Sequence, residues 1–191
     1  MEVILHYLAW TLILLVYAAI LGGLIGIIYH LIAMGITPIM TGIPFLQTDA
    51  NELIPILEEI KISPNMLMVD LGCGDGQLIS DISKKTPLKT LGCEVNPLLV
   101  WRGRFLNWIF RRKNTSIFKA KIEEFHDWKD ADITFIFLYP PAIAKLEDYF
   151  RDHLKKGSYL ISRAFPLSEE WKNKLVKEFP GKQFPYFLYK I

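Results

Sequence analysis

The chain of 191 residues has room for one domain of ordinary size and an appendage. Its 22 Lys and Arg nearly balance its 20 Asp and Glu, and the formal net charge of +2 provides no global field that favours a nucleic-acid partner. Two cysteines do not make a secreted disulfide scaffold, and the four histidines are scattered, so we expect neither disulfides nor a metal site.

The N-terminal segment is the most apolar part of the chain. Residues 3–40 contain no Asp, Glu, Lys or Arg, and residues 8–32 are almost wholly apolar. About 20 such residues suffice to cross a hydrocarbon core. A signal peptide normally has a basic start and an apolar stretch of roughly 7–15 residues, and a buried core helix of this length is exceptional in a small domain. We therefore expect residues 1–33 to be a retained single-pass membrane anchor.

The rest of the chain divides into a linker at 34–48, rich in Gly, Pro and Thr, and a folded domain at 49–191. Helices are predicted at 51–60, 77–84, 98–112, 143–154 and 167–179, and strands at 66–71, 88–94, 116–119, 133–138, 158–162 and 184–190. This alternation predicts an α/β fold with a Rossmann-like, doubly wound, mainly parallel sheet. The strand at 133–138 should be central, because it is apolar on both faces. One strand follows Lys182, so we expect a sheet trimmed at its C-terminus.

A glycine-rich turn follows the first predicted strand. Gly72, Gly74 and Gly76 supply backbone that reaches positive φ and lets a ligand approach closely. Glu94 ends the second strand about 20 residues later, which is the layout of a nucleotide-type cofactor site. The glycines alone fit NAD, FAD and S-adenosylmethionine equally. The alternative is a tight strand-to-helix connection beside a solvated acid.

Acidic residues around the turn separate these cofactors. Asp70 precedes the first glycine and Asp75 lies within the loop, where a dinucleotide site must hold a pyrophosphate. Two carboxylates would repel a diphosphate, but they attract the ammonium and sulfonium of S-adenosylmethionine. Gln77 also stands where the dinucleotide fingerprint has a glycine. We therefore expect S-adenosylmethionine as the cofactor, with Glu94 accepting both ribose hydroxyls.

The methyl acceptor should lie at the end of the fourth strand, because ligands of such sheets bind beyond the carboxyl ends of the strands where strand order reverses. Tyr139, Pro140 and Pro141 stand there. Tyr139 is the residue that we expect to line the acceptor channel, since aromatic rings stabilise a cationic amine. The alternative for the prolines is a rigid helix entry. No polar residue precedes them, which disfavours a DNA amino-methyltransferase that holds a flipped adenine.

Five segments together resemble a group of small seven-strand-type protein lysine methyltransferases, whose members include the mitochondrial enzymes that modify ATP synthase and the adenine nucleotide translocase. The segments are residues 41–48, 69–76, 94–101, 137–140 and 162–167. The most particular motifs are Glu-x-Asn-Pro-x-x-Val-Trp at 94–101 and Pro-aromatic-x-x-Thr at 44–48. Members of this group also carry an N-terminal apolar segment.

The resemblance implies a cofactor site and a substrate. The cofactor-binding residues would be Thr48, Asp70, Gly72, Cys73, Gly74, Asp75, Gly76, Glu94 and Asn96, with Tyr139 and Pro140 at the reacting centre. Thr48 and the Pro44-Phe45 pair would close over the cofactor or the incoming lysine. These enzymes usually offer an acid to the adenine after strand three, where this chain has Glu123 or Glu124 in a shifted register.

Three functions stay open. The first is a membrane-anchored methyltransferase for a lysine of a membrane-associated protein, the second a methyltransferase for a lipophilic acceptor such as a quinone or lipid precursor, and the third a non-catalytic cofactor-binding adaptor. A domain that uses S-adenosylmethionine should face the compartment that makes it, so we expect the catalytic domain on the cytoplasmic side. We expect no dedicated general base and a solvent-facing His126.

The basic, aromatic helix at 101–113 has two interpretations. Trp101, Phe105, Trp108 and Ile109 recur at helical spacing, which favours packing on the sheet. The alternative is a surface helix that rests on anionic lipid headgroups.

Overall fold

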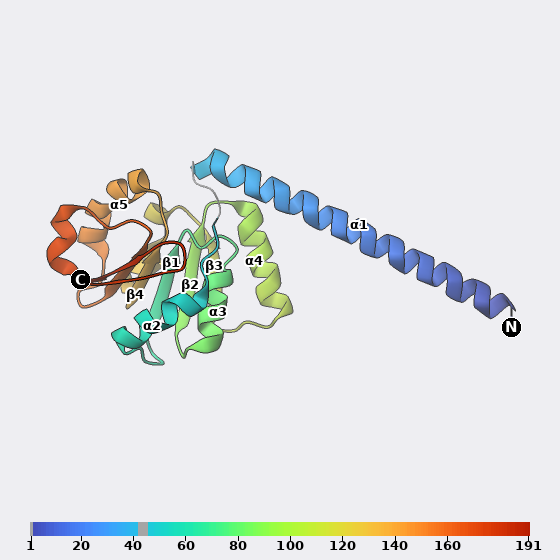
Figure 1. Cartoon of the computed structure of the whole chain (residues 1–191), viewed down its shortest axis with the longest axis horizontal. Coiled ribbons are helices and arrows are strands. Elements are labelled where there is room, and N and C mark those ends of the chain that lie inside the picture. The colour runs from blue at the N-terminus through green and yellow to red at the C-terminus, as the bar shows by residue number, and fades with distance from the viewer. Residues whose placement is uncertain (1, 42–45) are drawn as a thin grey trace. The chain divides into compact units, whose positions relative to one another are not determined.

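The computed structural model describes residues 2–41 and 46–191, which fall into two compact units (Figure 1). The first unit contains a single helix, α1 (Glu2–Thr41). Its part Glu2–Tyr29 has a mean hydropathy of 2.6, so it is long and apolar enough to cross a membrane. The helix continues over residues 34–41, which we predicted as linker, because extending an existing helix gains one hydrogen bond per residue.

The second unit is the predicted α/β domain. Its elements in chain order are α2 (Ala50–Ile60), β1 (Leu67–Leu71), α3 (Gln77–Lys85), β2 (Lys89–Glu94), α4 (Pro97–Ile109), β3 (Thr115–Lys119), η1 (Ile122–Glu124), η2 (His126–Asp130), β4 (Ile133–Ile136), α5 (Pro140–His153), β5 (Tyr159–Arg163), η3 (Glu169–Lys174), β6 (Leu175–Phe179) and β7 (Tyr186–Lys190). The three η elements are short 3-10 helices.

One seven-stranded sheet runs through this unit in the order β3-β2-β1-β4-β5-β7-β6. Figure 1 labels the first four strands of this order. The first five strands of this order are mutually parallel, and β7 is antiparallel to both of its neighbours. The predicted Rossmann-like fold is therefore confirmed. Strand β4 is central and fully buried, as its apolar sequence predicted. Strand order reverses between β1 and β4, where such sheets bind their ligands.

Helices cover both faces of the sheet, because successive residues of a strand point to opposite faces. On one face, Met68 and Phe135 pack with the apolar side of α2. On the other face, Val69 and Ile136 pack with α5 and with Trp128, whose ring meets that of Phe150 edge to face at 5.9 Å. The two cores hold the strand ends that carry the candidate site in fixed positions.

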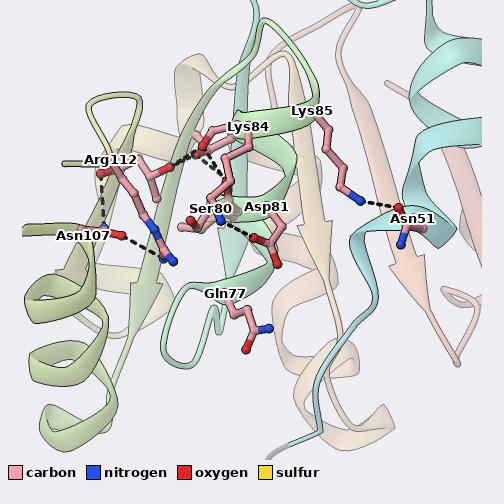
Figure 2. Close-up of polar contacts among 12 residues, drawn as sticks. Asn51, Gln77, Ser80, Asp81, Lys84, Lys85, Asn107 and Arg112 are labelled. Carbon is pink, nitrogen blue, oxygen red and sulfur yellow. Dashed lines mark hydrogen bonds and ion pairs between the residues drawn. The ribbon is translucent and has the colours of Figure 1, made fainter. Parts of the chain in front are cut away.

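Helix α2 begins where the sequence predicted. Asp49 is its N-cap, and the Asp49 carboxylate accepts a hydrogen bond from Asn51 N at 2.9 Å. The Asn51 side chain in turn accepts a hydrogen bond from Lys85 at the end of α3 (Figure 2). This contact joins α2 to α3, and the two helices pack on the same face of the sheet.

The predicted helix at 167–179 is wrong. Residues Glu169–Lys174 form the 3-10 helix η3, and Leu175–Phe179 form strand β6, which pairs with β7. The residues of β6 include both helix-favouring and strand-favouring types, so the non-local pairing with β7 decides its structure. The sheet is not trimmed at its C-terminus as we expected, because β6 and β7 form a hairpin that completes the seven strands.

The predicted packing of the α4 aromatics on the sheet is also wrong. Phe105 and Trp108 are exposed, and the buried residues of α4 are Leu99, Val100 and Gly103. The helix is apolar on two faces, so spacing alone did not identify the one that packs. Gly103 explains the choice, because a Cβ there would overlap the backbone carbonyl oxygen of Asp75.

Candidate active site

The glycine-rich loop connects β1 to α3 with backbone that favours glycine. Gly72, Gly74 and Gly76 have φ values of 91°, 57° and 71°. Any other residue is strained in this left-handed region. A Cβ at Gly76 would also overlap the side chain of Ile117 on β3. The loop therefore takes a compact path beside the ends of β1 and β2.

Glu94, at the end of β2, holds this loop. Its carboxylate is buried and accepts two backbone hydrogen bonds, one to Oε2 from Gly74 N at 3.0 Å and one to Oε1 from Asn96 N at 2.8 Å. Each carboxylate oxygen can accept more than one hydrogen bond. Glu94 can thus hold the loop and still accept hydroxyl groups of a ligand.

Asp70, at the end of β1, is a buried carboxylate beside Glu94. Only 4% of its surface is exposed. Burial raises the pKa of Asp70 from its ordinary value of 3.8 to about 8, and the charge of Glu94 acts in the same direction. The site therefore disfavours a second negative charge in the absence of a cation. A cationic ligand group would relieve this cost, whereas a pyrophosphate would increase it.

The two cysteines lie at the same strand ends as neutral thiols. Cys73 and Cys93 are buried and unbridged. Burial raises the pKa of the Cys73 thiol well above its ordinary value, and it raises the pKa of Cys93 to about 12. Because the thiolate is the reactive form of cysteine, neither residue has the character of a nucleophile. Cys73 contributes packing instead, since a Cβ at Gly92 of β2 would overlap its side chain.

Two of the predicted cofactor residues have structural partners. The Asp75 carboxylate accepts a hydrogen bond from Gln77 N at 3.2 Å and lies 3.0 Å from Arg102 Nη1, so its charge is balanced within the chain. The buried Asn96 is the N-cap of α4, and its Oδ1 accepts a hydrogen bond from Leu98 N at 3.0 Å. Of the two aspartates, Asp70 is therefore the one that best fits a cationic ligand group.

A buried arginine positions Thr48. Arg163 Nη1, at the end of β5, donates hydrogen bonds to Thr48 Oγ1 at 2.8 Å and to Gln47 O at 3.0 Å. Its guanidinium lies over the ring of Phe137, 4.6 Å from the ring centre. We did not assign a role to Arg163 from the sequence, although a basic residue at the end of an apolar strand was a usable signal. Pro44 and Phe45, predicted to close over the site, lie outside the described residues.

A polar cleft of about 330 Å³ adjoins Thr48 and the first turn of α3. Its lining residues are Gln47, Thr48, Asp49, Ala50, Asn51, Gln77, Asp81 and Lys85, four of which are labelled in Figure 2. Gln47 Nε2 donates a hydrogen bond to Gln77 Oε1 at 3.2 Å across it. The cleft therefore lies between the segment that Arg163 holds and the residue that follows the glycine-rich loop.

Tyr139 and Pro140 stand between β4 and α5. Tyr139 is the N-cap of α5 and Pro140 is at the start of the helix, so the proline does form a rigid helix entry. The Tyr139 ring is half exposed and meets the ring of Phe165 edge to face at 6.2 Å. A Cβ at Gly72 would lie 3.4 Å from the neighbouring Leu138 side chain. This segment therefore lies next to the glycine-rich loop.

The acids predicted near the adenine lie on η1. Glu123 and Glu124 are exposed, and Glu124 is 3.3 Å from Lys121 in a surface ion pair. Their adenine role stays a prediction. His126 is exposed, as predicted. Within residues 2–41 and 46–191, no group of three or more His, Cys, Asp or Glu side chains could hold a metal ion.

The strand order, the antiparallel β7 and the acids at the ends of β1 and β2 define a Rossmann-like methyltransferase fold. An RNA methyltransferase from Salinibacter ruber, solved with S-adenosyl-L-homocysteine, has this fold with a TM-score of 0.67 and 18% identity over 76% of this chain and 94% of that one. A precorrin-6y C5,15-methyltransferase from Geobacter metallireducens GS-15 gives a TM-score of 0.58 and 19% identity, over 76% and 91%.

A family model for the ANTKMT methyltransferase domain matches residues 70–174, and the chain belongs to this family. Its relatives include the adenine nucleotide translocase lysine N-methyltransferase of Mus musculus, 27% identical over 138 residues, which are 68% of this chain and 56% of the relative. A protein-lysine N-methyltransferase of Saccharolobus islandicus (strain REY15A) is 29% identical over 131 residues, 65% of this chain and 78% of the relative. The predicted resemblance is confirmed. The chain spans a little over half of the mouse relative's length.

Proposed function

We propose that this protein is an S-adenosylmethionine-dependent methyltransferase that transfers methyl groups to a lysine of a membrane-associated protein. The observation that carries the proposal is the pair of buried carboxylates, Asp70 and Glu94, at the ends of adjacent parallel strands beside a loop of positive-φ glycines. Membership of the ANTKMT methyltransferase family supports the reaction class.

The residues of the site fit this cofactor. Asp70 would pair with the methionine ammonium. The Glu94 carboxylate accepts two backbone hydrogen bonds, and its remaining lone pairs would accept the ribose hydroxyls. The glycines would admit the cofactor close to the backbone, and Thr48, fixed by Arg163, would close one side of the site. When bound, S-adenosylmethionine supplies a methyl group that its sulfonium already activates.

The protein's own contribution is positioning and desolvation. A lysine ammonium has a pKa of about 10.4 in water and must lose a proton before it reacts. An approach lined by the rings of Tyr139 and Phe165 would desolvate the ammonium and lower that pKa. Pro140 fixes the backbone at the start of α5 and thereby keeps Tyr139 at the end of the central strand.

Two further observations support the membrane anchoring and the lysine acceptor in this proposal. Helix α1 is long and apolar enough to span a bilayer, which supports an anchored enzyme with its α/β unit on the cytoplasmic side, where the cofactor is made. Relatives named as lysine N-methyltransferases for the adenine nucleotide translocase, for a component of ATP synthase and for proteins in general support a protein lysine as acceptor.

The test is to incubate membranes from a strain that lacks this protein with the purified full chain and cofactor radiolabelled in its methyl group. We expect label in protein bands that yields methyllysine after acid hydrolysis, and loss of that label with Tyr139→Ala. Label extracted only with lipid would support a lipophilic acceptor instead. Cofactor binding without transfer to either fraction would support a non-catalytic module.

A further inference from the structure

Helix α4 presents an aromatic face away from the sheet. We define the α4 aromatic face as Phe105, Trp108 and Ile109, which are 43%, 75% and 47% exposed; Phe110, the C-cap that follows them, is 61% exposed. Trp101 is 61% exposed one turn earlier, and its ring stacks on Phe105 at 5.5 Å and 4°. Large exposed apolar patches are uncommon on soluble monomers and mark interaction surfaces.

Basic residues surround this face. Residues 95–122 contain seven Lys and Arg and no Asp or Glu, although the whole chain carries a net charge of only +2. Arg104, Arg111 and Lys113, which lie close to these aromatic residues in the sequence, are exposed. Arg112 lies 5.1 Å from the centre of the Phe110 ring, and its Nη1 donates to Asn107 Oδ1 at 3.5 Å (Figure 2). The partner of this surface should therefore combine an apolar layer with negative charge.

An anionic bilayer surface has both properties. Tryptophan rings favour the membrane–water interface. A surface helix with aromatic residues and flanking Arg and Lys buries its apolar face about 5–10 Å into the headgroup boundary, and basic residues near an anionic surface strengthen this attachment. The chain also carries, in α1, a segment able to cross a membrane, so a bilayer is a partner that the sequence itself brings within reach.

We propose that the α4 aromatic face docks on an anionic lipid surface and orients the α/β unit against the bilayer. Helix α4 runs from Pro97, three residues after the ribose-binding candidate Glu94, to Ile109, and the α4 aromatic face lies toward its C-terminal end. Docking therefore fixes the angle of the α/β unit against the bilayer through the helix that begins at the candidate site. This is a second lipid contact, separate from the span. It does not depend on methyl transfer.

The test uses the full chain in nanodiscs, with Trp10→Phe and Trp101→Phe so that Trp108 is the exposed tryptophan. Trp128 and Trp171 are buried, and their emission is removed by subtracting the spectrum of the same protein with Trp108→Phe. Discs contain phosphatidylglycerol and phosphatidylcholine, with or without bromine on the acyl chains. We expect brominated lipid to quench most of the Trp108 emission in anionic discs and much less of it in purely zwitterionic discs.

The matched control places a tryptophan on the other edge of the sheet. Val176 is an exposed apolar residue on β6, the edge strand opposite β3. A Val176→Trp protein with Trp108→Phe should keep its emission in brominated anionic discs. Equal quenching at both positions, or no quenching at Trp108, would overturn the proposal. A Trp108 emission that responds to the number of protein copies per disc but not to bromine would overturn it as well and assign the face to a second copy.

These outcomes are independent of the enzyme proposal, because the measurement uses neither cofactor nor substrate. A protein that transfers methyl groups without lipid contact at Trp108 would overturn only the docking surface. Trp108→Phe itself should not unfold the protein, because the ring is largely in solvent; circular dichroism of the two proteins should coincide.

Discussion

Arg163 and Thr48, 115 residues apart in sequence, are joined by a 2.8 Å hydrogen bond from Arg163 Nη1 to Thr48 Oγ1. The arginine is 2% exposed and has the ring of Phe137 under its guanidinium. A buried charge is unfavourable unless polar atoms or aromatic rings compensate it. The bond therefore fixes the segment before α2 to the end of β5, on the edge of the sheet that carries the candidate site.

Thr48→Val should destabilise the protein by about 1–2 kcal/mol, because it leaves a buried charged donor with one acceptor fewer. Thr48→Ser keeps the hydroxyl and should stay within about 0.5 kcal/mol of the wild type. Urea unfolding of the full chain in detergent, followed by far-ultraviolet circular dichroism, measures both. Equal stability of the Val and Ser variants would show that the hydrogen bond from Arg163 to Thr48 does not stabilise the folded protein.

Cofactor affinity should rise with pH. Asp70 has a pKa raised to about 8 in the free protein, and it must be ionised to pair with the ligand ammonium. Below that pKa, binding has to remove a proton, so affinity should fall by up to about tenfold for each pH unit and level off above about pH 8. Calorimetric titration with S-adenosylhomocysteine measures this profile.

Asp70→Asn is the control for this profile, because it removes the titrating group. The affinity of this variant for the cofactor should be lower than that of the wild type at about pH 8 and should change little with pH below about pH 8. Asp148→Asn, which removes an exposed carboxylate paired with Arg151 on α5, should keep the wild-type profile. A wild-type affinity that does not change between about pH 6 and pH 8 would contradict the role of Asp70.

Glu94→Gln should weaken cofactor binding about 10- to 100-fold. The amide nitrogen of glutamine cannot accept, so either Gly74 N or Asn96 N loses its acceptor, and the ribose hydroxyls lose a charged partner. Hydrogen bonds to charged groups contribute about 1.5–3 kcal/mol, and about 1.4 kcal/mol corresponds to a factor of ten. Equilibrium dialysis gives the Kd. Glu170→Gln, at an exposed ion pair with Arg151, is the matched control, and equal Kd values for the two variants would refute the assignment.

The sequence predicted the elements whose signals are local. The strand at Ile133–Ile136 was predicted to be central because apolar side chains stand on both of its faces. The glycine-rich loop was identified by its three glycines, and all three have positive φ. Strand β6 was missed, because an exposed edge strand has no apolar pattern of its own and depends on β7.

Within the site, the contacts that the sequence did not predict again join residues that are far apart in the chain. Asp70 and Glu94 end adjacent strands, so the parallel register alone brings them together. The balance of the Asp75 charge by Arg102 depends on how α4 packs, and the role of Arg163 depends on a segment more than a hundred residues earlier. Neither the partner of Asp75 nor the orientation of the α4 aromatics follows from spacing, since α4 is apolar on two faces.

Gly103→Ala tests the packing that orients α4. An alanine in a helix interior normally stabilises by about 1 kcal/mol relative to glycine. At Gly103, however, the Cβ would overlap Asp75 O and the Ile117 side chain, so we expect a loss of about 1–3 kcal/mol. Because the overlap involves the glycine-rich loop, cofactor affinity should fall together with stability. Urea unfolding and cofactor titration measure the two effects, and a stabilised variant with unchanged affinity would contradict the close contact between α4 and the loop.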